Sequence, residues 1–202
     1  MKRDSLGTLL SWLHSGGREA GQILIRSRDD GFELCHRADA DRGDLTDFAG
    51  PEAARQIANF DETGQFRPLK TIRNLRRGWR LRLANVQELQ RALEGFYPAM
   101  LGVWQSWQRG ELLPVPLRAT LDRQSGMYRV ARKITNAQAE DLIAGFCPAC
   151  LKQRLWTVTG ASGIESAASA SAAPAFPLFC HEACNLLVAK AREVVKKSEG
   201  AP

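Results

Sequence analysis

Apolar residues recur along the chain at two spacings, and these spacings predict most of its elements. Leucines at the spacing of one helix face predict a helix over 5–14, which Gly16 and Gly17 end. Two apolar runs, 22–26 and 32–36, flank the turn residues Asp29, Asp30 and Gly31. This arrangement predicts a β-hairpin near the N-terminus.

Further along the chain, helix-like patterns outnumber strand-like ones. Residues 79–83 alternate apolar side chains with arginine, which is a strand pattern. A short strand is also expected at 127–130. Apolar positions at helical spacing, with proline or asparagine at several starts, predict further helices over 51–59, 85–94, 98–108, 136–143 and 180–197. The pattern therefore predicts an α+β protein, with an N-terminal mixed α/β-hairpin domain followed by a small helical domain.

The second domain is interrupted by a segment of low complexity. Residues 159–175 consist largely of glycine, alanine and serine, which is typical of a flexible insertion. We expect the N-terminal accessory domain to span 1–134 and the helical domain to span 135–202, with this insertion inside it.

Four cysteines near the C-terminus carry the strongest chemical signal. They form two close pairs, Cys147 with Cys150 and Cys180 with Cys184. Two disulfides would need an oxidising compartment, but the N-terminal residues do not have the pattern of a secretory signal. A thioredoxin-like motif would leave the second pair unexplained. A shared metal site is the better interpretation, and the expected location is the cytoplasm.

The spacing of the cysteines leaves the identity of the metal open. Both a structural zinc ion and an iron–sulfur cluster take four cysteine thiolates, and closely spaced cysteines occur with each. His181 is not needed as a ligand because the four thiols complete the set. Cys35 lies in an apolar alternation and is expected to be a small packed side chain.

The charge of the chain is concentrated in one stretch. The chain has 28 basic and 22 acidic residues, for a net charge of +6. No acidic residue occurs between Phe66 and Leu83, where the basic residues are Arg67, Lys70, Arg73, Arg76, Arg77, Arg80 and Arg82. This basic stripe fits nucleic acid, a polycarboxylate small molecule or a solvated face. The candidate anion-binding residues are Arg76, Arg77, Arg80 and Arg82.

Several strings together resemble a known family. They are residues 68–71, 74–79, 126–129, 147–156 and 180–185. They are similar to the extra domains of a multi-domain relative of the sirohydrochlorin/cobalt chelatases. In that family a chelatase-like core carries a stabilising α+β domain and a C-terminal [4Fe-4S] domain. The resemblance implies that the cluster ligands are Cys147, Cys150, Cys180 and Cys184.

The resemblance also implies a pathway. It suggests an accessory or electron-transfer component of tetrapyrrole metallation in siroheme or cobalamin synthesis. Its partner would be a sirohydrochlorin/cobalt chelatase, a redox protein or an anionic tetrapyrrole. The sequence has only three histidines and no counterpart of the chelatase core, so chelatase catalysis by this chain alone is not expected. The alternative is a zinc-stapled nucleic-acid-binding protein, which the resemblance makes less favoured. No membrane association is expected.

Overall fold

The chain folds into two compact units, each described here by itself. The computed structural model describes residues 5–61, 63–66, 75–112, 115–122, 126–159 and 175–200. The first unit contains the chain up to Arg109 and the later segment that ends at Leu178. The second unit contains the remainder, from Gly110 and again from Phe179. The units meet at Arg109 and Gly110, whereas the sequence suggests a boundary after Ile134.

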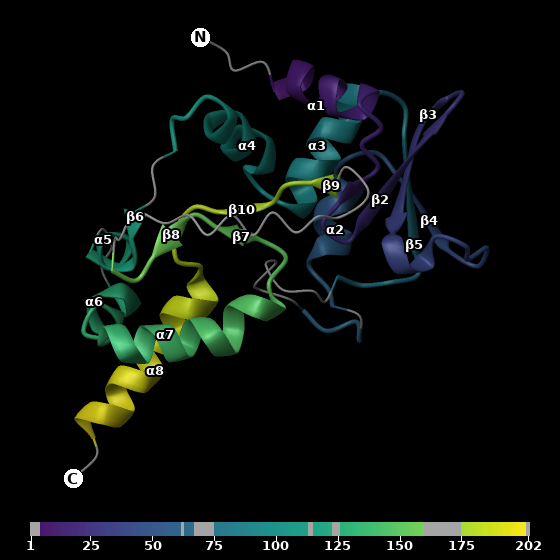
Figure 1. Ribbon diagram of the computed structural model, residues 1–202. Helices are drawn as coiled ribbons and strands as arrows, with labels where there is room; N and C mark the ends of the chain where they lie inside the picture. The colour runs from purple at the N-terminus through teal and green to yellow at the C-terminus, as the bar shows by residue number, and fades with distance from the viewer. Residues whose placement is uncertain are drawn as a thin grey trace. The chain divides into compact units, whose positions relative to one another are not determined.

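A mixed sheet forms the centre of the first unit (Figure 1). In the order in which they pair, its described strands are β4 (Thr46–Ala49), β5 (Trp79–Leu83), β3 (Gly31–His36), β2 (Ile23–Arg28), β1 (Glu19–Ala20) and β9 (Ala175–Phe176). The outer pairs, β4 with β5 and β1 with β9, are parallel, and the inner pairs are antiparallel. The predicted hairpin is confirmed as β2 and β3. Its turn requires Gly31, whose φ of 140° brings the backbone against the Leu83 carbonyl.

Helices cover the apolar face of this sheet. They are α1 (Ser5–His14), α2 (Ala53–Ala58), α3 (Val86–Phe96) and α4 (Met100–Gln108), with a short 3₁₀ turn, η1 (Arg37–Asp39). The register aligns Ile25, Leu34 and Leu81 across three strands, and all three are fully buried. Trp79 of β5 stacks on Phe96 of α3 with ring centroids 5.1 Å apart. The predicted helices at 5–14, 85–94 and 98–108 are confirmed within a few residues.

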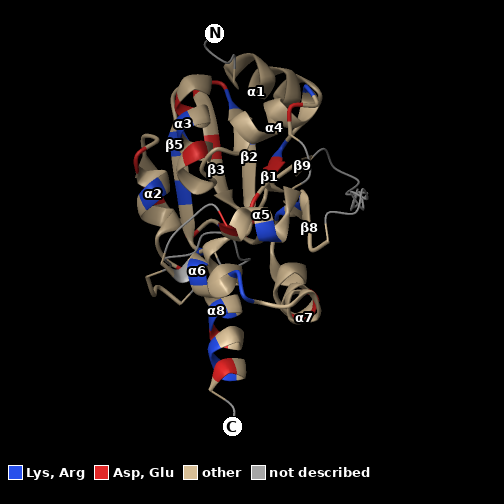
Figure 2. Ribbon diagram, turned by 90° about the vertical axis from the view of Figure 1, so that its left-hand side faces the viewer, with Lys and Arg blue, Asp and Glu red and all other residues tan. Residues whose placement is uncertain are grey.

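Helices also build the second unit. They are α5 (Leu117–Asp122), α6 (Met127–Ala131), α7 (Asn136–Phe146) and α8 (Asn185–Glu199), with the 3₁₀ turn η2 (Cys147–Ala149). The expected strand at 127–130 is wrong, because these residues form α6. Tyr128 and Ala131, one helical turn apart, pack in one core with Leu187 and Val188 of α8. This packing joins residues before Ile134 to the C-terminal helix. Figure 2 shows basic and acidic residues together along α8.

Short strands complete the second unit. They are β6 (Val115–Pro116), β7 (Gln153–Arg154), β8 (Trp156–Thr157) and β10 (Phe179–Cys180), paired in parallel as β6 with β8 and β7 with β10. The predicted insertion at 159–175 falls largely outside the described residues, which omit 160–174. None of the described helices is long and apolar enough to cross a membrane.

Candidate metal centre

The first cysteine pair lies where α7 ends. Thr135 begins this helix with a capping box, in which its side chain and that of Gln138 each accept a backbone N–H. Cys147 follows the helix directly and starts the turn η2, which contains Pro148. The Cys150 N–H donates to the Cys147 carbonyl at 2.9 Å and closes this turn. The two-residue spacing therefore forms one tight turn that carries a thiol at each end.

The second pair lies between a strand and a helix. Cys180 belongs to β10, and Cys184 is the N-cap residue of α8, with extended backbone angles and no side-chain capping bond. The predicted helix over 180–197 therefore begins later, at Asn185. The three-residue spacing is not one helical turn but a short link from strand to helix.

Strand pairing brings the two cysteine pairs to one place. β7 follows Cys150 closely and pairs with β10, so that Arg154 lies opposite Cys180. The Leu155 N–H also donates to the Cys180 carbonyl at 2.9 Å. These bonds join segments on the two sides of the 160–174 gap in the described residues.

The four thiols are free and close enough to affect one another. All four are half-buried, and none forms a disulfide. Burial raises the pKa of Cys180 to about 11, and the nearby thiolates of Cys184 and Cys150 raise this pKa further. Burial also raises the pKa of Cys147, with Cys184 and Cys150 again contributing. Each pair therefore feels the other, as expected for one shared site.

Hydrogen-bond donors and cations surround the thiols. The Trp156 indole N–H donates to Cys180 Sγ at 3.3 Å, and the Lys152 backbone N–H donates to Cys150 Sγ at 3.5 Å. The charges of Arg154 and Lys152 lower the pKa values of Cys147 and Cys180, respectively, against the effect of burial. These groups favour thiolates, which are the form that binds metals.

The arrangement of the thiols bears on the kind of metal group. Within the described residues, no group of three or more His, Cys, Asp or Glu side chains could hold a metal ion as it stands. Four thiolates on one zinc ion share a single centre with Zn–S bonds of about 2.3 Å. On a four-iron cluster each thiolate binds a different iron, so the sulfurs lie further apart. Thiols that are near one another but not convergent on one ion fit the cluster better.

The basic stripe lies in the first unit, and part of it can be placed. Arg67, Lys70 and Arg73 fall outside the described residues. Arg80 and Arg82 lie on one face of β5, where β4 supplies an acidic partner. Arg80 Nε is 2.9 Å from Asp47 Oδ1, without hydrogen-bond alignment, and an Arg82 nitrogen is 3.5 Å from Asp47 Oδ2. The stretch without acidic residues in sequence is therefore partly neutralised in space. Anion binding by Arg76, Arg77, Arg80 and Arg82 stays a prediction.

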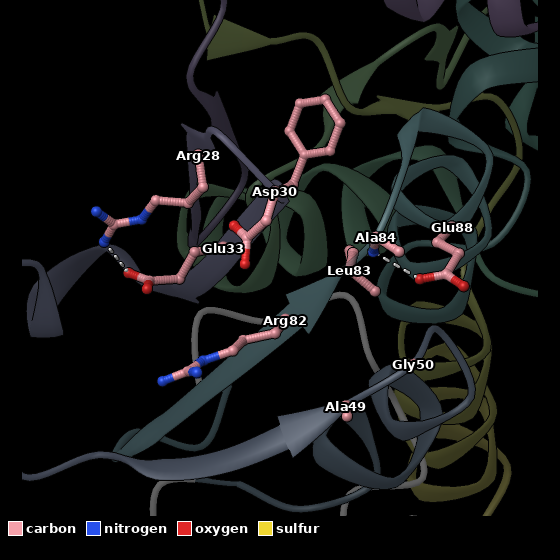
Figure 3. Close-up of a pocket in the computed structure, with 10 residues that line it drawn as sticks. Arg28, Asp30, Glu33, Ala49, Gly50, Arg82, Leu83, Ala84 and Glu88 are labelled. Atoms are coloured by element: carbon pink, nitrogen blue, oxygen red, sulfur yellow. Dashed lines mark hydrogen bonds and ion pairs between the residues drawn. The ribbon is translucent and has the colours of Figure 1, made fainter.

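Two features were not predicted from the sequence. The first is the set of groups around the thiols, Lys152, Arg154 and Trp156, which follow the first cysteine pair at alternate positions. This alternation was the available signal. The second is a cavity of about 500 Å³ in the first unit. Figure 3 shows its mixed lining, with Arg28 paired to Glu33 at 2.9 Å and the Ala84 N–H donating to Glu88 at 2.8 Å.

Comparison with known proteins defines the class of each part of the chain. Residues 9–108 match the family described as the DR2241 stabilising domain. Residues 109–193 match the 4Fe-4S iron-sulfur cluster binding domain. The chain therefore belongs to the family that joins these two domains, and its second part is an iron–sulfur binding domain. All four cysteines fall inside the second match.

A solved structure has the same arrangement. It is DR2241 from Deinococcus radiodurans, described as a multi-domain protein with structural similarity to chelatases and two additional novel domains. The similarity has a TM-score of 0.78 at 32% sequence identity, and it covers 95% of this chain and 41% of that protein. This chain thus spans less than half the length of DR2241. No curated protein matches the sequence.

Proposed function

We propose that this protein binds one [4Fe-4S] cluster through Cys147, Cys150, Cys180 and Cys184. The observation that carries the proposal is the pairing of β7 with β10, which gathers four free thiols inside the part of the chain that matches the 4Fe-4S domain. When bound, the cluster supplies one-electron transfer or a covalent clamp between the two pairs. Four thiolates saturate its irons, so no open iron remains for substrate chemistry.

Anaerobic purification tests this proposal. We expect a brown protein with about four irons and four sulfides per chain. Replacement of any one of the four cysteines by serine should bleach or destabilise the cluster. Cys35→Ser is the matched control, because Cys35 is buried in the first unit and should leave iron and sulfide unchanged. Stoichiometric zinc without sulfide in the wild type would contradict the proposal.

The role of the protein is proposed from its relatives. Because DR2241 has structural similarity to chelatases, we place this protein as an accessory or electron-transfer component of tetrapyrrole metal chelation, in siroheme or cobalamin synthesis. Its partner would be a chelatase-like protein or an anionic tetrapyrrole. The zinc-stapled nucleic-acid binder is less favoured, because Asp47 already pairs with two arginines of the stripe.

The tetrapyrrole proposal is tested on β5. Two guanidinium groups on one face suit the paired carboxylates of sirohydrochlorin. The double variant Arg80→Ala/Arg82→Ala should weaken sirohydrochlorin binding and leave the cluster intact. Asp47→Asn should strengthen binding, because it removes the competing carboxylate. Arg91→Ala is the control, because Arg91 lies on α3 and pairs with Glu52 instead.

Three outcomes of this test separate the alternatives. Sirohydrochlorin affinity that follows the three variants in this order supports the tetrapyrrole role. Salt-sensitive DNA binding that is lost in the double variant, with no affinity for sirohydrochlorin or a chelatase, would favour the nucleic-acid binder. Equal sirohydrochlorin affinity in all variants would remove β5 from the binding site.

A further inference from the structure

One aromatic side chain contacts the metal centre directly. The indole N–H of Trp156 donates to Cys180 Sγ at 3.3 Å. Among the described hydrogen bonds with printed partners, this is the one that joins a donor side chain to any of the four thiols. No motif required a tryptophan here, and a purely structural tryptophan could equally turn its N–H toward a carbonyl.

The position of the donor does not depend on a metal. Trp156 is 2% exposed and belongs to the core of the second unit, with Leu187 and Val188 of α8. Its strand, β8, pairs with β6 at Val115. One residue earlier, the Leu155 N–H holds the Cys180 carbonyl. Backbone and core therefore hold the indole and the sulfur in place from both sides.

The hydrogen bonds of Cys180 change character when the sulfur becomes a metal ligand. The thiol S–H now donates to the Glu182 carbonyl at 3.0 Å. A ligating thiolate has lost this proton and can only accept hydrogen bonds. The Trp156 N–H is already oriented to donate to it. The indole thus serves the ligating form of Cys180, whereas the Glu182 carbonyl serves the free thiol.

A cation strengthens this donor. The guanidinium carbon of Arg154 lies 5.2 Å from the centroid of the Trp156 ring. A cation over the ring face draws electron density from the indole, so its N–H becomes a better donor. Arg154 also sits opposite Cys180 in the β7–β10 pair.

We propose that Trp156 raises the reduction potential of the metal centre by donating its indole N–H to the Cys180 ligand. One-electron reduction of a thiolate-bound cluster adds one negative charge, which spreads onto the ligand sulfurs. A donor to one of these sulfurs stabilises the reduced state more than the oxidised state, and hydrogen bonds to sulfur are known to set cluster potentials. Trp156 acts here as a positioning residue for Cys180. This inference rests on the proposed cluster ligands.

The test compares two tryptophan variants in the full-length, anaerobically prepared protein. Trp156→Phe keeps an aromatic ring in the core but removes the N–H. Trp104→Phe is the matched control, because Trp104 packs edge to face on Phe176 in the first unit. Iron, sulfide and the visible spectrum are measured first, and each protein is then titrated with dithionite as the one-electron donor.

The expected result is full loading in all three proteins, with a more negative midpoint potential in Trp156→Phe alone. Arg154→Gln should shift the potential in the same direction by less. An unchanged potential in fully loaded Trp156→Phe, or an equal shift in Trp104→Phe, would overturn the inference. A wild type without iron and sulfide would instead refute the proposed cluster, and the loading measurement identifies that case.

A measurement on the wild type covers the case in which Trp156→Phe does not load. Tryptophan labelled with ¹⁵N in the indole ring is incorporated, and the reduced, paramagnetic protein is studied by electron–nuclear double resonance. We expect one indole nitrogen coupled to the electron spin, because the donor contacts a ligand sulfur. Absence of this coupling would overturn the inference.

Discussion

The two units of the chain are held together in different ways. In the first, adjacent strands align fully buried residues such as Ile25, Leu34 and Leu81 under helix α3. In the second, each described strand has two residues, and the core lies among helices α5 to α8. The four thiols of the second unit are half-buried at the ends of short elements.

This difference predicts how each unit depends on metal. Burial of apolar area stabilises the first unit without a ligand, at roughly 25 cal/mol for each Å² removed from water. In the second unit, two cysteine-bearing segments meet through a two-residue strand pair, and a metal group that binds both adds its binding free energy to folding. The first unit is therefore a scaffold, and the stability of the second is linked to its cofactor.

Removal of the cluster should have the largest effect and should divide the units most clearly. After chelation, amide exchange is expected to accelerate in the second unit, beyond about Gly145, because its clamp is lost. Exchange in β2, β3 and β5 should stay unchanged. Hydrogen exchange with mass spectrometry on the holo- and apoprotein measures both. Equal protection of the second unit in the two forms would show that the cluster is not the clamp.

Thiol reactivity should divide the cysteines in the same way. In the apoprotein the four half-buried thiols are expected to alkylate quickly. Cys35, at 1% exposure, should react roughly a hundredfold more slowly, because it must wait for the first unit to open. Burial also raises its pKa, so less thiolate is present at pH 8, and the reaction should speed up as the pH rises. Mass spectrometry of a timed alkylation measures the rates. Fast labelling of Cys35 would contradict the rigidity of the first unit.

A matched pair of core truncations sharpens the comparison. Leu81→Ala in the first unit should lower the free energy of unfolding by about 3 kcal/mol in both holo- and apoprotein. Leu187→Ala in the second unit should have a comparable effect on that unit, but cluster binding should offset it in the holoprotein. Urea titrations followed by circular dichroism and by cluster absorbance separate the two. If bound cluster stabilises Leu81→Ala as strongly as Leu187→Ala, the units are not independent.

Two helix caps should give the smallest change. Asn85 Oδ1 accepts the Glu88 N–H at 3.0 Å at the start of α3, and Thr135 Oγ1 accepts the Gln138 N–H at 3.2 Å at the start of α7. Each substitution to alanine should cost about 1 kcal/mol, because one backbone N–H loses its partner. Asn85→Ala should act on the first unit alone and Thr135→Ala on the second alone. A loss of cluster in Asn85→Ala would break this division.

Local patterns in the sequence predicted the longer elements well. Apolar spacing gave α1 and β5 with their observed bounds, and Asn85 is the N-cap of α3 as expected. The α+β class is confirmed as well. Residues 127–130 were misassigned because four residues are too few to separate strand from helix by periodicity. The two-residue strands could not be predicted at all, since they are shorter than either period.

The sequence by itself determined which side chains can bind a metal, because the type and spacing of the four cysteines specify the donor atoms. It also determined the apolar faces, because periodicity reports local backbone conformation. Only the tertiary structure decided that β7 pairs with β10 and joins the two cysteine pairs, that Trp156 reaches Cys180, and that Asp47 meets Arg80 and Arg82. These contacts join residues far apart in the chain, and their free energy comes from packing and hydrogen bonds that no local pattern records.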